Sequence, residues 1–270
     1  MTGVTTMDWA PVAQGGRYRL GQVARMEWIK LRSLRSTRWL LALVVLAMVG
    51  VGGGVGVGYR AHTPVASAAQ IVNNALGGAA LAQLLLAALG ILLVTGEYSS
   101  GTIRATFAAV PHRGVVLAAK ATVFGVVAFV VGELAALAAF AAGQVAISGS
   151  PVPHASLGDP AVLRAVLLTG AYLGVVGLLG MGLGVLIRHA GGAIGGLFGL
   201  LFVPVFLAGL FGSAAFGVLK FVPLIILANS VAVVTPVPGT LSAWAGFGVM
   251  CGYAVVALGL GWWLLARRDA

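Results

Sequence analysis

Residues 39–57 read WLLALVVLAMVGVGGGVGV, an uncharged run long enough to cross a membrane. A helix needs about 20 predominantly apolar residues to span the ~30 Å hydrocarbon layer of a bilayer. Five further apolar runs follow, near Asn74–Val94, Ala121–Ile147, Val162–Ile187, Ala193–Phe211 and Leu241–Ala266. The sequence therefore predicts an all-α membrane protein with six transmembrane helices.

The overall composition supports this fold class. The chain is 60% hydrophobic and 8% charged, with a mean hydropathy of +1.06, whereas a soluble domain carries about 25% charged residues. The stretches between the runs are too short to bury a core of their own. We expect residues 1–16 to be disordered and residues 17–270 to form a single six-span domain.

The basic residues lie mostly on one side of the predicted membrane. With the N-terminus in the cytoplasm, thirteen of the sixteen fall on the cytoplasmic side: Arg17, Arg19, Arg25, Lys30, Arg32, Arg35, Arg38, Arg104, Arg113, Lys120, Arg188, Arg267 and Arg268. The positive-inside rule therefore predicts that both termini are cytoplasmic. A net charge of +10 would suggest nucleic acid in a soluble protein. Here we expect the basic rim to face anionic membrane lipids instead, with no nucleic-acid partner.

The segment before the first span has the pattern of an interfacial helix, here called the elbow helix. Between Arg17 and Arg38 its apolar residues recur at helical spacing: Leu20, Val23, Ala24, Trp28, Leu31 and Leu34. A basic helix with Trp and Leu on its apolar face lies in the membrane interface; a solvated tail is the alternative. Glu27 falls inside the apolar stripe, so we expect it to pair with Lys30, with Arg35 or with a partner's charge.

Two other features concern how the spans pack. Between residues 212 and 240 the apolar run Phe221–Leu227 is too short to cross, which predicts an outer re-entrant segment rather than two more crossings. Several glycines of the fourth and fifth spans recur every four residues, a spacing that permits close helix contact. These are Gly170, Gly174, Gly180, Gly184, Gly191, Gly195 and Gly199.

Catalytic and cofactor motifs are missing from the sequence. There is no HExxH, CxxC or GxSxG, and the four histidines are far apart, so we predict no metal site and no cofactor. None of the three lysines follows a glycine, so a GxxxxGK[ST] nucleotide loop cannot occur. We therefore expect that the chain is not an enzyme.

The densest polar stretch follows the second span, where residues 95–114 read TGEYSSGTIRATFAAVPHRG. We expect Ser100 or Thr102 to cap a short helix that ends before Pro111. Its apolar side chains share one face: Ile103, Phe107 and Val110. That face either fits a groove on a partner protein or packs on the ends of the chain's own spans.

Glu133 falls near the middle of the third span, where a carboxylate costs about 2.5–3.5 kcal/mol on insertion scales. It must therefore face protein or water. Gln83, at similar depth in the second span, is the expected hydrogen-bond partner. The pair is either a polar clamp between helices or part of a translocation route.

Three segments together resemble the permeases of ABC-2 type transporters. Residues 96–120, GEYSSGTIRATFAAVPHRGVVLAAK, resemble the segment after the second span of that family. Residues 26–39, MEWIKLRSLRSTRW, resemble its elbow helix, and residues 267–270, RRDA, its charged C-terminal end. The resemblance implies a permease subunit of an ATP-driven exporter in the bacterial plasma membrane. It also implies two copies of a separate cytoplasmic ATPase and a second permease subunit, identical or a sister protein.

In that family the ATPase acts through the loop after the second span, which contains a coupling helix. The resemblance assigns this role to Glu97, Tyr98, Gly101, Thr102, Arg104, Phe107, Pro111 and Arg113. It assigns Glu27, Lys30 and Arg35 to the elbow helix. Two other functions stay open: an ion- or proton-driven carrier that uses Glu133, and a non-transporting membrane scaffold. The cargo does not follow from the sequence.

Overall fold

The computed structural model describes residues 20–62, 66–110, 112–211, 216–233 and 240–267, and the regular structure in these ranges is helical throughout. Six of its helical segments are long and apolar enough to cross a membrane. The elements are α1 (Leu20–Ser33), α2 (Arg35–His62), α3 (Ala68–Ala75), η1 (Leu76–Gly78), α4 (Ala79–Ser99), α5 (Thr102–Ala109), α6 (Arg113–Ile147), α7 (Pro160–Ile187), α8 (Ala190–Phe211), α9 (Phe216–Leu219), α10 (Pro223–Val231) and α11 (Ala243–Arg267). The prediction of an all-α six-span membrane protein is confirmed. The predicted disorder of residues 1–16 falls outside the described residues.

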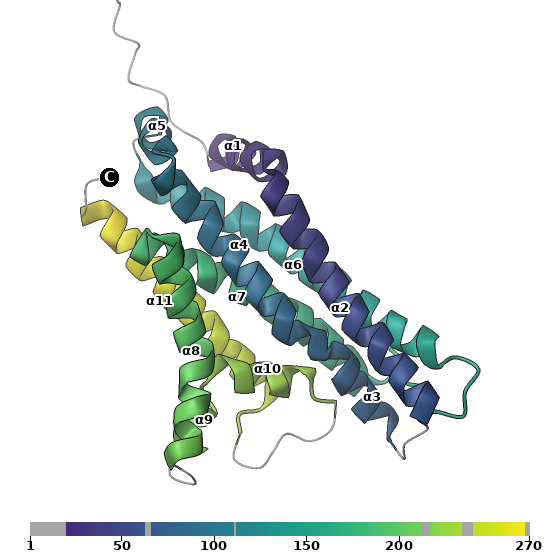
Figure 1. Cartoon of the computed structure of the whole chain (residues 1–270). Helices are drawn as coiled ribbons and strands as arrows, with labels where there is room; N and C mark the ends of the chain where they lie inside the picture. Colours follow the sequence, from purple (N-terminus) through teal and green to yellow (C-terminus); the bar gives the residue numbers. More distant parts are fainter. Residues whose placement is uncertain (1–19, 63–65, 111, 212–215, 234–239, 268–270) are drawn as a thin grey trace, which may run out of the picture.

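Helix α7 is the centre of the bundle. It packs against α4, α6 and α11, while α2 packs mainly on α6. Of the six spans, α7 is the most deeply buried and α8 the least, and Figure 1 shows α8 at the side of the bundle. The apolar core therefore forms around α7, and α8 leaves most of its apolar surface uncovered within this chain.

Glycines let several of these helices approach one another closely. A Cβ on Gly52 of α2 would overlap the Ala139 carbonyl group of α6, and one on Gly180 of α7 would overlap the Ala87 backbone of α4. Close packing through small residues is confirmed for these helices. Among the described residues, Gly195 and Gly199 of α8 make no such contact, since nothing lies within 4 Å of an added Cβ, because α8 lies at the edge of the bundle.

The two ends of the bundle differ in their elements (Figure 1). Helices α1 and α5 lie at the same end as the C-terminal turn of α11, here called the α1/α5 end, and α3, α9 and α10 lie at the other. The nine-residue α10 lies across that other end rather than through the bundle, as the predicted re-entrant segment requires. Hydrogen bonds from the Val233 amide to Asn73 and from Arg164 to the Ala232 carbonyl tie its end to the bundle.

The elbow helix is shorter than the sequence suggested, and its apolar stripe is divided. Helix α1 ends at Ser33 and the chain turns at Leu34, so Arg35 begins α2 rather than belonging to the elbow helix. Only Val23, Glu27 and Leu31 of α1 are buried. Leu20, Trp28 and Leu34, predicted on the same face, are exposed, because α1 contacts the bundle along a narrower strip than the apolar pattern covers. Their exposure agrees with a face turned to the membrane interface.

Candidate functional site

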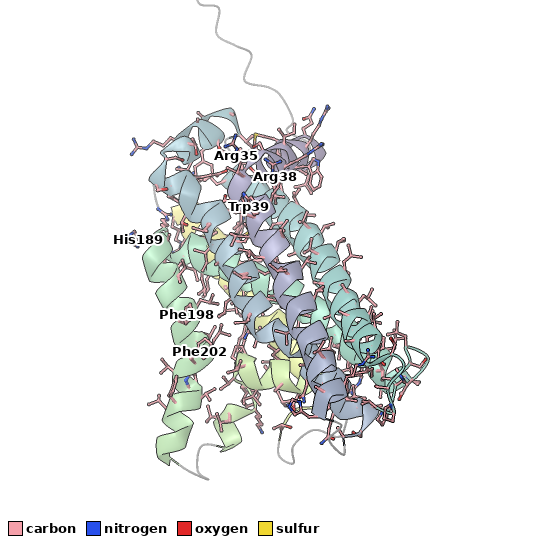
Figure 2. The ribbon with its side chains drawn as sticks, turned by 45° about the vertical axis from the view of Figure 1, so that its right-hand side comes forward. Arg35, Arg38, Trp39, His189, Phe198 and Phe202 are labelled. Atoms are coloured by element: carbon pink, nitrogen blue, oxygen red, sulfur yellow. The ribbon has the colours of Figure 1, made fainter. Side chains whose placement is uncertain are left out.

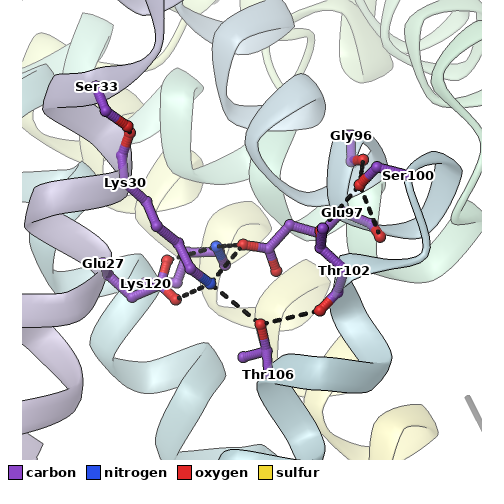
Figure 3. Close-up of polar contacts among 9 residues, drawn as sticks. All are labelled: Glu27, Lys30, Ser33, Gly96, Glu97, Ser100, Thr102, Thr106 and Lys120. Atoms are coloured by element: carbon purple, nitrogen blue, oxygen red, sulfur yellow. Dashed lines mark hydrogen bonds and ion pairs between the residues drawn. The ribbon is translucent and has the colours of Figure 1, made fainter.

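Four charged side chains from three helices meet at the α1/α5 end (Figure 3). Lys30 Nζ lies 3.1 Å from Glu27 Oε1 and 2.9 Å from Glu97 Oε1. Lys120 Nζ lies 2.5 Å from Glu27 Oε2 and 2.9 Å from Glu97 Oε1. Each lysine thus binds both carboxylates. These residues, from α1, α4 and α6, are called the four-charge cluster below.

The four-charge cluster is largely removed from solvent. The exposed fractions of the side chains are 4% for Glu27, 9% for Lys120, 13% for Glu97 and 34% for Lys30. Taking an ion out of water costs several kcal/mol, which only well-formed opposite charges and hydrogen bonds can offset. The two lysines and two glutamates supply these opposite charges, and the net charge of the cluster is zero.

The Lys30 ammonium stays protonated in this setting. Burial by itself lowers the pKa of Lys30, but hydrogen bonds to Glu97 and Glu27 and the charges of both carboxylates outweigh it. The pKa of Lys30 therefore lies above its ordinary value of 10.5. The cluster accordingly keeps this positive charge throughout the neutral range.

Local sequence explains two parts of this arrangement: the contact between Glu27 and Lys30, and the turn that brings α5 to the cluster. Glu27 and Lys30 are three residues apart on α1 and therefore share a face. Gly101 adopts a left-handed backbone with φ +71°, a conformation that glycine adopts without strain, and the chain turns there from α4 into α5. The turn places Thr106 Oγ1 of α5 3.1 Å from Lys30 Nζ, so α5 is joined to the cluster.

The predicted side-chain cap of α5 is wrong. The capping position is Gly101, which has no side chain to offer, and no side-chain hydrogen bond caps the helix. The Ser100 hydroxyl instead bonds to the Gly96 carbonyl oxygen and lies 2.9 Å from Thr102 Oγ1. Pro111 lies outside the described residues; Val110 before it is extended, as residues preceding proline usually are.

Helix α5 has a buried face and an exposed face. Ile103, Thr106 and Val110 are buried and Phe107 is half-buried in the apolar core. Of the two alternatives left open by the sequence, packing on the chain's own spans is therefore the one observed. The exposed face carries Arg104, Ala105 and Ala108, and this is the side of α5 that a partner protein can reach.

A second set of contacts joins the same end of the bundle to α7 and α11. Arg113 donates to the Leu265 carbonyl oxygen at 3.1 Å, and its guanidinium lies 5.3 Å from the Phe107 ring centroid. Arg188, at the end of α7, lies 5.2 Å from the ring centroid of Tyr98. Predicted loop residues thus contact helices remote from them in sequence.

Sequence reasoning missed Lys120, Thr106 and Arg188 as parts of this site. Lys120 lies 93 residues from Glu27, and no spacing rule connects residues so far apart. The one available signal was a lysine at the start of an apolar span, where an unpaired charge is costly. Arg35, a predicted elbow residue, has an exposed side chain and does not contact the cluster.

The expected pair of Glu133 and Gln83 is not formed. Gln83 Oε1 accepts a hydrogen bond from the Tyr172 hydroxyl at 2.9 Å. Glu133 packs instead against Gly170 of α7, where an added Cβ would lie 2.5 Å from its carboxyl carbon. Its Oε2 is buried without a hydrogen-bond partner among the described residues. The two side chains miss each other because α4 and α6 barely touch and both pack on α7.

Tyr172→Phe is expected to cost about 1–3 kcal/mol of stability, the price of leaving buried polar groups unsatisfied. The Tyr172 hydroxyl lies 2.9 Å from both Gln83 Oε1 and the Pro223 carbonyl oxygen at the start of α10. Unfolding in mixed micelles measures the loss. Tyr253→Phe is the matched control, because its hydroxyl bonds to the Phe221 carbonyl oxygen at an exposed position. Equal losses of stability in the two variants would contradict the expectation that the buried hydroxyl contributes more than the exposed one.

A cavity of about 630 Å³ adjoins the four-charge cluster between α1, α4 and α6. Its walls include the cluster residues and the apolar side chains Leu31, Leu92, Leu93, Val123 and Phe124. Near the cluster, α1 and α4 are therefore joined by ion pairs and are not packed against each other along the whole of this cavity.

In comparisons with known proteins, no family model matches this chain and no curated protein is significantly similar to it. The class of protein follows from its own features: an all-α, multi-pass membrane protein. At one end, the largely buried four-charge cluster joins the two short helices α1 and α5 to the spans.

Proposed function

We propose that this chain is the permease subunit of an ATP-driven exporter, and that separate ATPase subunits act on it through α5. The observation that carries the proposal is the construction of α5. One face is held in the bundle by Ile103, Val110 and Thr106, while Arg104, Ala105 and Ala108 face outward. A short helix that is exposed on one side and fixed on the other can receive a force and transmit it.

The four-charge cluster supplies the route of transmission. Lys30 Nζ bonds to Thr106 of α5, to Glu27 of α1 and to Glu97 of α4, and Lys120 extends the connection to α6. A displacement of α5 therefore moves α1 and the ends of two spans together. The adjoining cavity shows that α1 and α4 are not packed side chain against side chain beside the cluster.

The rest of the assembly follows from the resemblance and from the charge distribution. In this proposal the α1/α5 end lies in the cytoplasm of a bacterium, since most of the basic residues are there. A second permease subunit, identical or a sister protein, completes the translocation path in the plasma membrane. Closure of two ATPase subunits on ATP pushes on α5 and α1, and the spans around the dimer axis open a path outward.

Ala105→Trp and Ala108→Trp are expected to weaken ATPase binding about tenfold, equivalent to about 1.4 kcal/mol. Either indole would stand on the exposed face of α5, where the partner must dock. The affinity is measured between the full chain in lipid nanodiscs and a purified candidate ATPase from the same bacterium, together with the stimulation of ATP hydrolysis. Ala61→Trp is the control, because Ala61 is exposed at the opposite end of α2. Unchanged affinity and unchanged stimulation in both α5 variants would refute the role of α5.

A proton-driven carrier is the second candidate, favoured by the half-buried Glu133, whose Oε2 is buried without a partner among the described residues. Reconstituted vesicles separate the candidates. Transport that requires the added ATPase and ATP supports the exporter, and transport driven by a pH step without any ATPase supports the carrier. A membrane scaffold would give neither result.

A further inference from the structure

We propose that the corner between α1 and α2 binds the headgroup of an anionic phospholipid, with Arg35, Arg38 and Trp39 as its principal contacts. This inference concerns the outer side of the corner, opposite the four-charge cluster. It does not depend on the exporter proposal, because a lipid site at this position is compatible with any function of the spans.

The three residues form one surface on the first turns of α2 (Figure 2). Arg35, Arg38 and Trp39 are spaced at i, i+3 and i+4, so they lie on one face of the helix. With Ala42 they line an open groove of about 520 Å³. All three side chains are exposed, and Trp39 is 71% exposed. The groove is therefore open to molecules outside the chain.

The charges at this corner are divided between its two sides. The inner side carries Glu27 and Glu97, and both form ion pairs with Lys30 and Lys120. The outer side carries four exposed arginines with no carboxylate partner in the described ranges: Arg25, Arg32, Arg35 and Arg38. A second open groove of about 440 Å³, lined by Arg25, Trp28, Ile29, Arg32 and Ser33, continues the basic surface onto α1. No carboxylate of the described ranges balances these charges, so the arginines are available to an anion that approaches from outside the bundle.

The chemistry around the arginines selects a phosphate that carries acyl chains. Guanidinium groups bind phosphate oxygens through paired hydrogen bonds, and tryptophan side chains favour the headgroup level of a bilayer. Below Trp39, the same face of α2 continues with Leu43 and Leu46, which are 44% and 65% exposed. Along this face, sites for a phosphate, for the headgroup region and for acyl chains follow one another from the arginines through Trp39 to the leucines. A phospholipid carries the same three parts in the same order.

The test uses the full chain in phosphatidylcholine nanodiscs that contain a small fraction of phosphatidylglycerol with brominated acyl chains. Bromine quenches nearby indoles, and the difference between wild type and Trp39→Phe isolates the signal of Trp39 from that of the other tryptophans. We expect phosphatidylglycerol to quench Trp39 more strongly than brominated phosphatidylcholine at the same fraction. Arg35→Gln and Arg38→Gln should each lower the apparent affinity about fivefold, and the pair about 25-fold.

Two further variants make the outcome unambiguous. Arg60→Gln removes an exposed arginine at the far end of the same helix and should leave the Trp39 signal unchanged. Arg35→Lys with Arg38→Lys keeps the charge but loses the paired guanidinium hydrogen bonds, so its preference should fall between those of the wild type and the double glutamine variant. Equal quenching by the two lipids would overturn the proposal, as would an unchanged preference in the double glutamine variant. A Trp39 signal that neither lipid quenches would mean that a second copy or another protein covers this face, which also overturns it.

Discussion

Lys120→Met is expected to destabilise the protein by about 3–5 kcal/mol, because it breaks a buried ion cluster by removing one cation. Lys120 Nζ contacts both Glu27 and Glu97, and its side chain is 9% exposed. In the variant, Lys30 alone faces two carboxylates, of which Glu27 is 4% exposed. One negative charge is then buried without compensation, and α6 loses its ionic connection to α1.

A second substitution shows whether charge is the cause. Glu27→Gln in the Lys120→Met background restores neutrality, since Lys30 and Glu97 remain as a pair, and it should recover a large part of the lost stability. Unfolding by SDS titration in mixed micelles measures the four members of the cycle. Arg60→Gln, at an exposed position, should change stability by no more than about 0.5 kcal/mol. Simple additivity of the two cluster substitutions would contradict the coupling described here.

Gly180→Val is expected to cost at least about 3 kcal/mol, the upper part of the range for overpacked cores. A Cβ on Gly180 would overlap three backbone atoms of Ala87: its carbonyl oxygen, its Cα and its carbonyl carbon. These are backbone atoms of α4, which cannot move aside as the end of a side chain can. The two helices must therefore separate, at the contact where the central helix meets the second span.

Gly199→Val is the matched control. It introduces the same β-branched side chain into another membrane span, at a position with nothing within 4 Å of the added Cβ. The intrinsic cost of valine in a helix is then common to both variants, and the difference reports the helix contact alone. Folded yield and unfolding in micelles give the comparison. Similar losses in both variants would show that α4 and α7 do not rely on this close approach.

The fold could be predicted from sequence because its main determinants are local. Runs such as residues 39–57 define spans by their length and apolarity alone. The short apolar run near Phe221 is likewise too short to cross, and α10 lies across the bundle end instead. The orientation of α1 was less accessible. Its apolar stripe predicts a face turned to the membrane interface, but only the packing of the bundle decides that Val23 and Leu31 are covered by protein while Trp28 is exposed.

In the candidate site, too, contacts between residues close in sequence could be predicted and contacts between distant residues could not. The contact between Glu27 and Lys30 follows from their spacing of three residues on one helix. The contacts of Lys120 with Glu27 and of Gln83 with Tyr172 join residues 93 and 89 positions apart. Only the packing of whole helices brings such residues together. Gln83 and Glu133 lie at similar depth in their spans, but depth does not specify which helix lies between two others.

The glycines of α7 have a consequence for motion within the bundle. Gly170 borders Glu133 of α6, Gly180 borders the Ala87 backbone of α4, and Gly182 borders Ala257 of α11. At these points the neighbours meet bare main chain, without interlocking side chains that would have to change rotamer when one helix shifts along another. At these three points shear of α4, α6 and α11 along α7 therefore meets less steric resistance than lateral separation, which loses the close approach of the helices.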